Sequence, residues 1–201
     1  MSLKGCLFIV SAPSGAGKTT LCRRLIEAVD KLEYSISYTT RERRSGEVEG
    51  VDYHFVSKEE FEKLIKMNAM AEWACVYGEH YGTPKSAVET VLDQGKDLLV
   101  DVDVQGGAQL KRLFPDAIRV FVLPPSLEEL ENRLKTRGRD DPDALAQRLA
   151  TAKEEIEAAP EYDYAVVNEQ LHEALGCLVS IVTACRCRAR RNLDLISSLT
   201  R

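Results

Sequence analysis

A glycine-rich loop near the N-terminus constrains the fold of this chain more than any other feature. Residues 11–20 read SAPSGAGKTT, with an apolar run at residues 6–10 before them and an amphipathic run at residues 18–29 after them. A buried strand, a glycine-rich turn and a helix in this order are typical of the start of an α/β domain built on a parallel sheet. The pattern therefore predicts an α/β fold whose first strand and first helix are joined by this loop.

The loop has the residue types that bind a nucleotide phosphate. Gly15 and Gly17 let successive backbone N–H groups curl around a phosphate without obstruction by a Cβ. Lys18 can neutralise phosphate oxygens, the helix N-terminus adds partial positive charge, and the Thr19 hydroxyl is placed to coordinate Mg²⁺. Ala12 stands where the usual pattern has glycine, so we expect a backbone conformation there that alanine tolerates. A chance glycine-rich turn is the alternative, and the strand and helix around the loop argue against it.

The rest of the chain continues the alternation of strands and helices. Buried strands are predicted at residues 97–102 and 118–123, a last short strand at residues 164–167, and a C-terminal helix from residue 169 onward. Capping boxes predict helix starts at Ser57 and Ser126, because each serine is followed three residues later by glutamate. Aromatic, strand-like pieces between residues 34 and 83 indicate an antiparallel insertion, and the charged Gly/Pro segment at residues 137–143 is typical of a mobile lid loop.

The charge of the chain limits its partners. A formal net charge of -5 argues against a general nucleic-acid or membrane binder, while arginines clustered at residues 41–44 and 133–148 suit small anionic ligands. No apolar run approaches the roughly 20 residues of a membrane span, and the first residues carry no signal-peptide pattern. We therefore expect a cytoplasmic protein with no membrane and no nucleic-acid partner. The basic run at residues 186–191 is expected to be a solvated helix face.

Two consecutive segments narrow the function. Residues 35–47 read SISYTTRERRSGE and residues 50–55 read GVDYHF, and together they resemble the GMP-binding segment of guanylate kinases. The similarity continues through Glu72-Trp73, Tyr81-Gly-Thr83, residues 101–106, residues 124–126, Arg137-Gly138 and Val167-Asn168, and it covers about residues 4–185. The resemblance implies a P-loop nucleotide kinase fold: a central parallel sheet flanked by helices, a small mixed GMP-binding insertion and a helical lid. It implies one domain, residues 1–201, with a core at residues 1–33, 84–136 and 151–201, a GMP-binding region at about 34–83 and a lid at about 137–150.

The implied reaction is the transfer of the γ-phosphoryl group of ATP to GMP by in-line displacement with Mg²⁺, giving ADP and GDP, as part of purine nucleotide metabolism. The ATP contacts would be Ala12, Pro13, Ser14, Gly15, Ala16, Gly17, Lys18, Thr19, Thr20 and Asn168. The Mg²⁺ contacts would be Thr19 and Asp101, and the cations that stabilise the transferring phosphoryl group would be Lys18, Arg41, Arg137 and Arg148. Asp101 could instead start a turn at a strand end, and Asn168 could instead cap a turn.

The resemblance also assigns the acceptor site. The implied GMP contacts are Ser37, Arg41, Arg44, Tyr53, Glu72, Tyr81, Thr83 and Asp103. Arginines and tyrosines suit the phosphate, while a carboxylate at Glu72 can accept both adjacent donors of guanine, N1–H and the N2 amino group. Asp103 either contacts GMP or orients an arginine. Surface arginines, core tyrosines and an exposed strand glutamate are the alternatives. Arg43 replaces a proline of the family pattern, so the loop loses a fixed φ.

Two other functions have to be weighed. A kinase of the same family that acts on another acceptor, such as a ribose bisphosphate, would have little use for Ser37, Glu72 and Thr83. A guanylate-kinase-like interaction module without catalysis typically has a damaged phosphate loop, whereas this loop retains Lys18. ATP and GMP are therefore the expected partners, and the sequence leaves open whether the chain forms a homo-oligomer.

Overall fold

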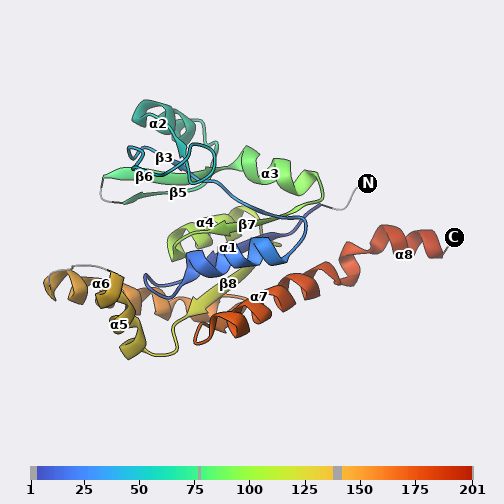
Figure 1. Cartoon of the computed structure of the whole chain (residues 1–201). Helices are drawn as coiled ribbons and strands as arrows, with labels where there is room; N and C mark the ends of the chain where they lie inside the picture. The colour runs from blue at the N-terminus through green and yellow to red at the C-terminus, as the bar shows by residue number, and fades with distance from the viewer. Residues whose placement is uncertain (1–3, 77, 138–141, 201) are drawn as a thin grey trace.

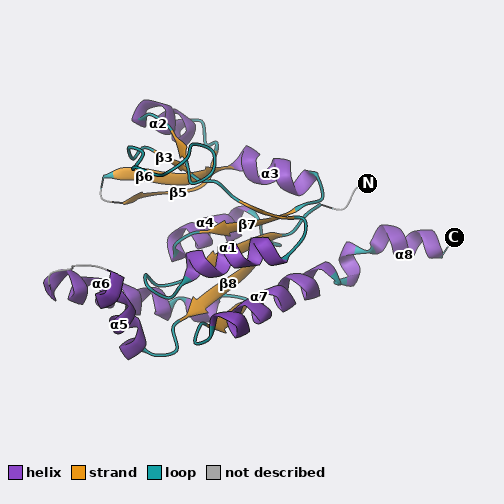
Figure 2. Ribbon diagram, in the orientation of Figure 1, coloured by secondary structure: helices purple, strands orange, loops and turns teal. Residues whose placement is uncertain are grey.

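The computed structural model describes residues 4–76, 78–137 and 142–200, and its main element is a five-stranded sheet (Figure 2). The strand order is β2 (Leu32–Tyr34), β7 (Asp97–Asp101), β1 (Leu7–Ser11), β8 (Ile118–Leu123) and β9 (Tyr164–Val167). All neighbouring strands in this order pair in parallel. The central strands β1 and β7 are almost wholly buried, as expected for a parallel sheet that is covered on both faces. The α/β prediction and the three predicted strands are thus confirmed.

Helices cover both faces of this sheet (Figure 1). Alternate residues of β1 point to opposite faces, so Phe8 and Val10 belong to one apolar core and Leu7 and Ile9 to another. The first core is covered by α1 (Lys18–Ala28) and α7 (Leu171–Arg186), which pack against each other. The second is covered by α3 (Lys85–Asp93) and α4 (Val104–Leu113). The phosphate loop therefore leaves the carboxyl end of a central strand that is held on both sides.

A second, smaller sheet is inserted between β2 and α3. Its strand order is β4 (His54–Phe55), β3 (Tyr38–Thr39), β6 (Glu79–Pro84) and β5 (Met70–Val76), with α2 (Lys58–Lys66) following β4 in the chain. β6 is antiparallel to β3 and β5, but β3 and β4 are parallel because residues 40–53 cross over between them. The sheet is therefore mixed, as the family resemblance implies, and the expectation of an antiparallel insertion was wrong for this pair.

Two helices, α5 (Leu127–Arg137) and α6 (Pro142–Glu157), lie next to each other beyond β8 and are followed by the 3-10 turn η1 (Ala159–Glu161). They share a small core of Leu130, Leu134 and Ala152. The helix starts predicted from capping boxes are confirmed, since Ser57 Oγ accepts the Glu60 N–H at 3.1 Å and Ser126 Oγ accepts the Glu129 N–H at 3.0 Å. The predicted mobile loop at residues 137–143 falls mainly on residues 138–141, which lie outside the described residues.

The C-terminal basic run, residues 186–191, differs from the expectation of a solvated helix face. α7 ends at Arg186, and the turn η2 (Ala189–Arg191) and helix α8 (Leu193–Leu199) follow it away from the sheet (Figure 1). Arg186 Nε and Arg191 Nη1 lie 2.8 and 3.3 Å from the two carboxylate oxygens of Asp97, whose side chain is 4% exposed. The expectation of a solvated helix face was therefore wrong for these two arginines. A buried carboxylate needs paired cations, and Asp97 at the start of β7 takes both.

None of the helices in the described ranges combines the length and the hydropathy needed to cross a membrane.

Candidate active site

The phosphate loop has the backbone that the sequence predicts. Gly15 and Gly17 both have φ of 92°, a left-handed conformation that glycine adopts without strain, and Gly17 is the N-cap of α1. Ala12 is not among the residues of positive φ in the described part of the chain, so alanine is tolerated there, as expected. Lys18 opens α1, and its Nζ donates to the Val102 carbonyl at 2.9 Å. The lysine thereby connects the loop after β1 to the segment after β7.

Asn168 supports this loop from the end of β9. Its side-chain amide donates to the Ala16 carbonyl at 2.7 Å, and a Cβ on Gly17 would lie 2.4 Å from the Asn168 nitrogen. Asn168 also lines a cavity of about 420 Å³ beside the loop, together with Gly15, Thr20, Glu129, Asn132, Arg133 and Thr136. The backbone of Gly17 can approach Asn168 this closely only because glycine has no side chain.

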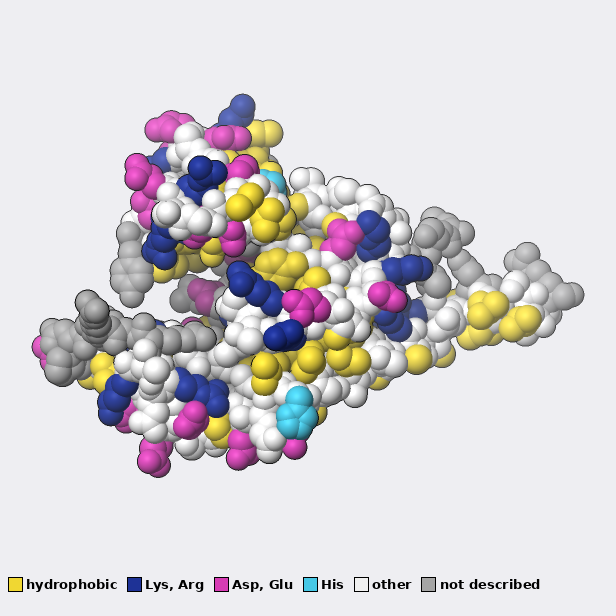
Figure 3. Space-filling model, in the orientation of Figure 1, with side chains coloured by type: hydrophobic (Ala, Val, Ile, Leu, Met, Phe, Trp, Pro, Cys, Tyr) yellow, Lys and Arg dark blue, Asp and Glu magenta, His cyan; other side chains and the backbone are white. Residues whose placement is uncertain are grey.

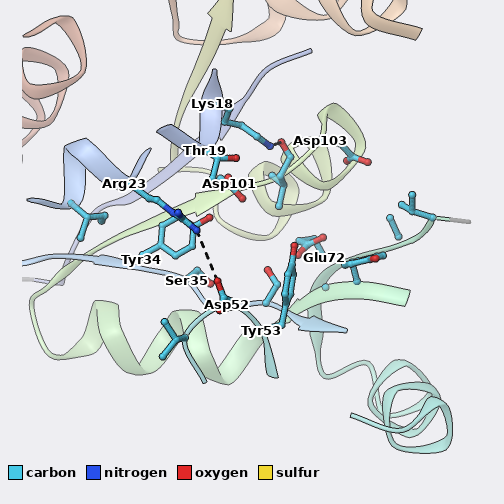
Figure 4. A pocket seen from close by; sticks show the side chains of 18 of the residues that line it. Lys18, Thr19, Arg23, Tyr34, Ser35, Asp52, Tyr53, Glu72, Asp101 and Asp103 are labelled. Atoms are coloured by element: carbon cyan, nitrogen blue, oxygen red, sulfur yellow. Dashed lines mark hydrogen bonds and ion pairs between the residues drawn. The ribbon is translucent and has the colours of Figure 1, made fainter. Parts of the chain in front are cut away.

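A larger cavity of about 840 Å³ opens between the main sheet and the insertion. It is lined by predicted residues from both parts: Lys18, Thr19, Asp101 and Asp103 from the core, and Ser37, Tyr53, Glu72 and Tyr81 from the insertion. In Figure 4, Lys18 and Thr19 lie at one end of the cavity, and Tyr53 and Glu72 lie at the other. The space-filling view is hollowed at this level, between the insertion and the helices α5 and α6 (Figure 3).

Glu72 is a buried carboxyl group at the wall of this cavity. It lies on β5 opposite Thr83 of β6 and is 4% exposed. Burial raises the pKa of Glu72 to about 7, the Asp103 carboxylate adds to the rise, and Thr83 and Lys18 oppose it. Ser37 Oγ lies 3.3 Å from Thr83 Oγ1, so the predicted carboxylate and both predicted hydroxyls meet at one place.

The predicted arginines of the insertion are held by an acidic residue that the sequence analysis did not single out. Glu47 receives two hydrogen bonds from the Arg41 guanidinium, at 2.7 and 3.1 Å, and one from the Arg44 backbone N–H at 2.8 Å. Glu47 raises the pKa of Arg41, and the Arg41 guanidinium lowers the pKa of Glu47. Glu47 is the acidic residue at the end of a basic segment, and this position could have identified it from the sequence as a partner of the arginines.

The two predicted tyrosines lie beside Arg41. The Arg41 guanidinium is 5.6 Å from the ring centre of Tyr53. The rings of Tyr53 and Tyr81 meet edge to face, with centres 6.0 Å apart. Arg41, Tyr53 and Tyr81 thus form one cluster, whereas the exposed Arg44 joins it through its backbone contact with Glu47.

Asp101 and Asp103 leave the same strand end with different partners. Asp101 is the last residue of β7, and its carboxylate lies near the Tyr34 hydroxyl. Burial raises the pKa of Tyr34, and the charge of the Asp101 carboxylate adds to the rise. Asp103 is the N-cap of α4, where its carboxylate accepts the Gly106 N–H at 2.7 Å. Both residues line the larger cavity.

One of the predicted lid residues contacts the phosphate loop at Ser14. Arg148, on α6, donates from Nη2 to Ser14 Oγ at 3.1 Å. Glu155, one further residue that the sequence analysis missed, lies near the same loop: burial raises the pKa of its carboxyl group, and the Ser14 backbone N–H opposes that rise. The sequence could have identified Glu155 by its position seven residues after Arg148, because this spacing places both residues on one face of a helix. Arg137 is the last residue of α5, and its side chain lies outside the described part of the structure.

A family model described as guanylate kinase matches residues 4–185 of this chain. The chain belongs to the guanylate kinase family. A guanylate kinase of Syntrophotalea carbinolica is 50% identical over 191 residues, which cover 95% of this chain and 91% of that protein. One from Neisseria gonorrhoeae is 47% identical over 196 residues, covering 98% of this chain and 96% of that protein.

A crystal structure of guanylate kinase from Anaplasma phagocytophilum is also similar to this chain. Its TM-score is 0.76 at 32% sequence identity, and the match covers 94% of this chain and 90% of that chain. The family and the fold class predicted from the sequence are therefore confirmed, and the guanylate kinase family supplies the frame for the site.

Proposed function

We propose that this chain transfers the γ-phosphoryl group of ATP to GMP within the cavity between its main sheet and its insertion. The family makes the chain an ATP:GMP phosphotransferase, and the roles of individual residues are our proposal. The observation that carries it is the shared cavity of about 840 Å³, which is lined by Lys18 from the phosphate loop and by Glu72 from the insertion. A phosphate-binding cation and a base-reading carboxylate at opposite ends are what a transfer between two nucleotides requires.

The insertion would hold GMP. Guanine offers N1–H and the N2 amino group side by side, and the Glu72 carboxylate can accept both, while the Ser37 and Thr83 hydroxyls are available to O6. Adenine presents an acceptor at N1, which would leave the buried carboxylate without a donor. The phosphate of GMP would take the place of Glu47 on Arg41, with Tyr53 and Tyr81 adding hydroxyl donors. Exchange of one oxyanion for another on Arg41 keeps its charge neutralised throughout.

The core would hold ATP. The backbone N–H groups of residues 14–20, which lead into α1, suit the phosphates, and Lys18 can turn from the Val102 carbonyl toward them. Thr19 and Asp101 fit a Mg²⁺ ion brought with ATP, because both are oxygen donors that line the same cavity. Bound there, the ion would neutralise charge on the phosphate oxygens. The cavity that Asn168 lines beside the loop would receive the rest of the nucleotide.

The reaction needs no protein nucleophile. An oxygen of the GMP phosphate would form a bond to the γ-phosphorus while the bond from that phosphorus to the bridging oxygen of ADP breaks. Lys18, Arg41, Arg137 and Arg148 would stabilise the charge on the transferring group. Closure of the segment at about 137–150 over the core, with the GMP-binding region at about 34–83 on the other side, would exclude water. This division of the domain into core, GMP-binding region and lid is part of the proposal.

Turnover with different acceptors tests the proposed acceptor site. We expect ADP formation from ATP with GMP and little with AMP, UMP or dTMP, measured at equal acceptor concentrations. Equal turnover with AMP would contradict the role given to Glu72, since adenine cannot supply the two donors.

Lys18→Ala tests the proposed donor site. It should lower kcat by about two to three orders of magnitude while the melting temperature stays near that of the parent. Arg24→Ala is the matched control, because Arg24 lies on the same helix, is exposed, and pairs with the exposed Glu27. A folded Lys18→Ala protein with near-normal kcat would refute the assignment of the loop.

A further inference from the structure

The strand that carries Glu72, β5, lies at the edge of the smaller sheet. It is the last strand in the order of that sheet and pairs with β6, so the backbone groups on its other edge need partners from outside the sheet. The register of β5 against β6 shifts between Met70 and Glu72, and an irregularity of this kind redirects the side chains beside it. The position of Glu72 therefore depends on what holds the outer edge of β5 as well as on its pairing with β6.

The helix α4 of the core packs against β5 at this edge. Gly106, Gln109 and Leu110 are spaced by three and four residues from the first of them, so they share one face of α4. Leu110 is fully buried in the same apolar core as Ala71 of β5. A Cβ on Gly106 would lie 3.2 Å from Glu72 Oε2. This face of α4 thus lies close to the part of β5 that includes Glu72.

Gln109 completes the contact at the residue after Glu72. The Trp73 backbone N–H donates to Gln109 Oε1 at 3.1 Å, and Gln109 Nε2 donates to the Trp73 carbonyl at 3.1 Å. A carboxamide has an acceptor and a donor side by side, so it pairs with a residue of an edge strand much as a neighbouring strand would. A helix of the core therefore holds the backbone of β5 directly beside Glu72.

The exposure of this pair indicates positioning rather than stability. Gln109 is half-buried and the Trp73 side chain is 38% exposed, so water can replace either hydrogen bond at little cost to folding. The two bonds still fix a distance and a direction between α4 and β5. Asp103 is the N-cap of the same helix and lines the cavity together with Glu72. A shift of β5 relative to α4 would therefore move Glu72 relative to the core.

We propose that Gln109 is a positioning residue for guanine selection: its carboxamide fixes the Trp73 backbone to α4 and so holds the neighbouring Glu72 carboxylate where it accepts both donors of guanine. This inference rests on the proposed function, in which Glu72 reads the base. Two adjacent donors must be met at once, so a carboxylate that is displaced or tilted loses at least one of them. Gln109 itself contacts neither nucleotide and acts through Glu72.

The test is GMP affinity, measured by calorimetry for the parent protein and for Gln109→Ala. Alanine removes both hydrogen bonds and suits a helix, so the variant should fold, which melting curves establish. The Kd and the KM for GMP should rise about threefold to thirtyfold, while kcat at saturating GMP and the Kd for ATP stay unchanged. Gln109→Glu should show the same loss, because it places a carboxylate oxygen against the Trp73 carbonyl. Arg112→Ala, at an exposed position of the same helix, is the matched control and should leave all four values unchanged.

The same substitution in a Glu72→Gln background separates positioning from a merely structural role. Because Gln109 acts through the Glu72 carboxylate, Gln109→Ala should change the Kd for GMP less than about twofold in that background. An equal loss of GMP affinity in both backgrounds would overturn the proposal. Parental GMP affinity in folded Gln109→Ala, or an equal loss of ATP affinity, would overturn it as well. Failure of the proposed function looks different: the parent protein would not bind GMP, or Glu72→Gln would bind it as tightly as the parent.

Discussion

Replacing Glu72 with glutamine tests how the protein would select guanine. The Glu72 side chain is 4% exposed, so a side chain substituted at this position contacts the bound base rather than water. Glutamine keeps one acceptor oxygen but turns an NH₂ donor toward the donors of guanine, which leaves buried groups unpaired. We expect GMP binding to weaken by about 2–4 kcal/mol, or about 30-fold to 1,000-fold in Kd. The Kd for ATP should change little, since the phosphate loop lies at the other end of the cavity.

The pH dependence of GMP binding gives a sharper version of the same test. Burial holds the pKa of Glu72 at about 7, so its ionised fraction is about 0.1 at pH 6 and about 0.9 at pH 8. Only the carboxylate can accept both guanine donors, so binding should strengthen as the pH rises through 7. Since the apparent Kd scales inversely with the competent fraction, it should fall about ninefold between pH 6 and pH 8.

Guanosine is the appropriate ligand for this assay, because the phosphate of GMP has its own ionisation near pH 6. Calorimetric titrations of guanosine at pH 6, 7 and 8 should show the ninefold gain in the parent protein and a flat profile in Glu72→Gln. A parent profile as flat as that of the variant would refute the reasoning. A profile that rises equally in both proteins would assign the titration to another group.

Three further outcomes follow from the same structure. Because the folded-state pKa of Glu72 lies above its ordinary 4.5, this group favours folding at low pH and loses that contribution as the pH rises through 7. Urea denaturation at pH 8 should therefore show that ligand-free Glu72→Gln is up to about 3 kcal/mol more stable than the parent. An equal or lower stability of the variant would contradict this. Arg191→Ala should cost about 1–3 kcal/mol by leaving Asp97 one cation short, with kcat unchanged in the folded protein, whereas the exposed Arg190→Ala should cost little. Small-angle scattering should show partial compaction with GMP and the fullest with GMP plus a non-hydrolysable ATP analogue, and a ligand-free protein as compact as the doubly liganded one would refute lid closure.

The parts of the fold that were predicted are those in which local sequence and tertiary packing agree. Apolar runs bounded by turns predicted four of the five strands of the parallel sheet, β1, β7, β8 and β9, because buried strands require continuous apolar residues, whereas β2 was not predicted. α4 was not predicted, since Gly106 and Gly107 lower the helix propensity of its first turn. Those glycines are explained only by the packed structure, in which a Cβ on Gly107 would lie 3.0 Å from the Tyr162 hydroxyl and one on Gly106 3.2 Å from Glu72.

The residues of the candidate site divide in a similar way. Lys18 and Thr19 follow from a local motif, and Glu72 with Ser37 and Thr83 from the family pattern, and the structure brings both sets to one cavity. Whether they act as proposed stays a prediction until the substitutions are made.

Two acidic residues that the sequence analysis missed, Glu47 and Asp97, have one physical reason in common. A search for an anion-binding site selects cations and N–H donors, yet those groups still need partners before any ligand arrives, because unpaired buried polar groups and charges destabilise the folded state. Glu47 pairs with the Arg41 guanidinium at the cluster where the GMP phosphate is proposed to bind. Asp97 pairs with two arginines at the opposite end of the strand from Asp101, away from the cavity, and so fixes the C-terminal segment permanently. Glu47 should therefore give up Arg41 to the phosphate of GMP, whereas Asp97 should keep its two arginines, which is why disturbing Asp97 is expected to change stability.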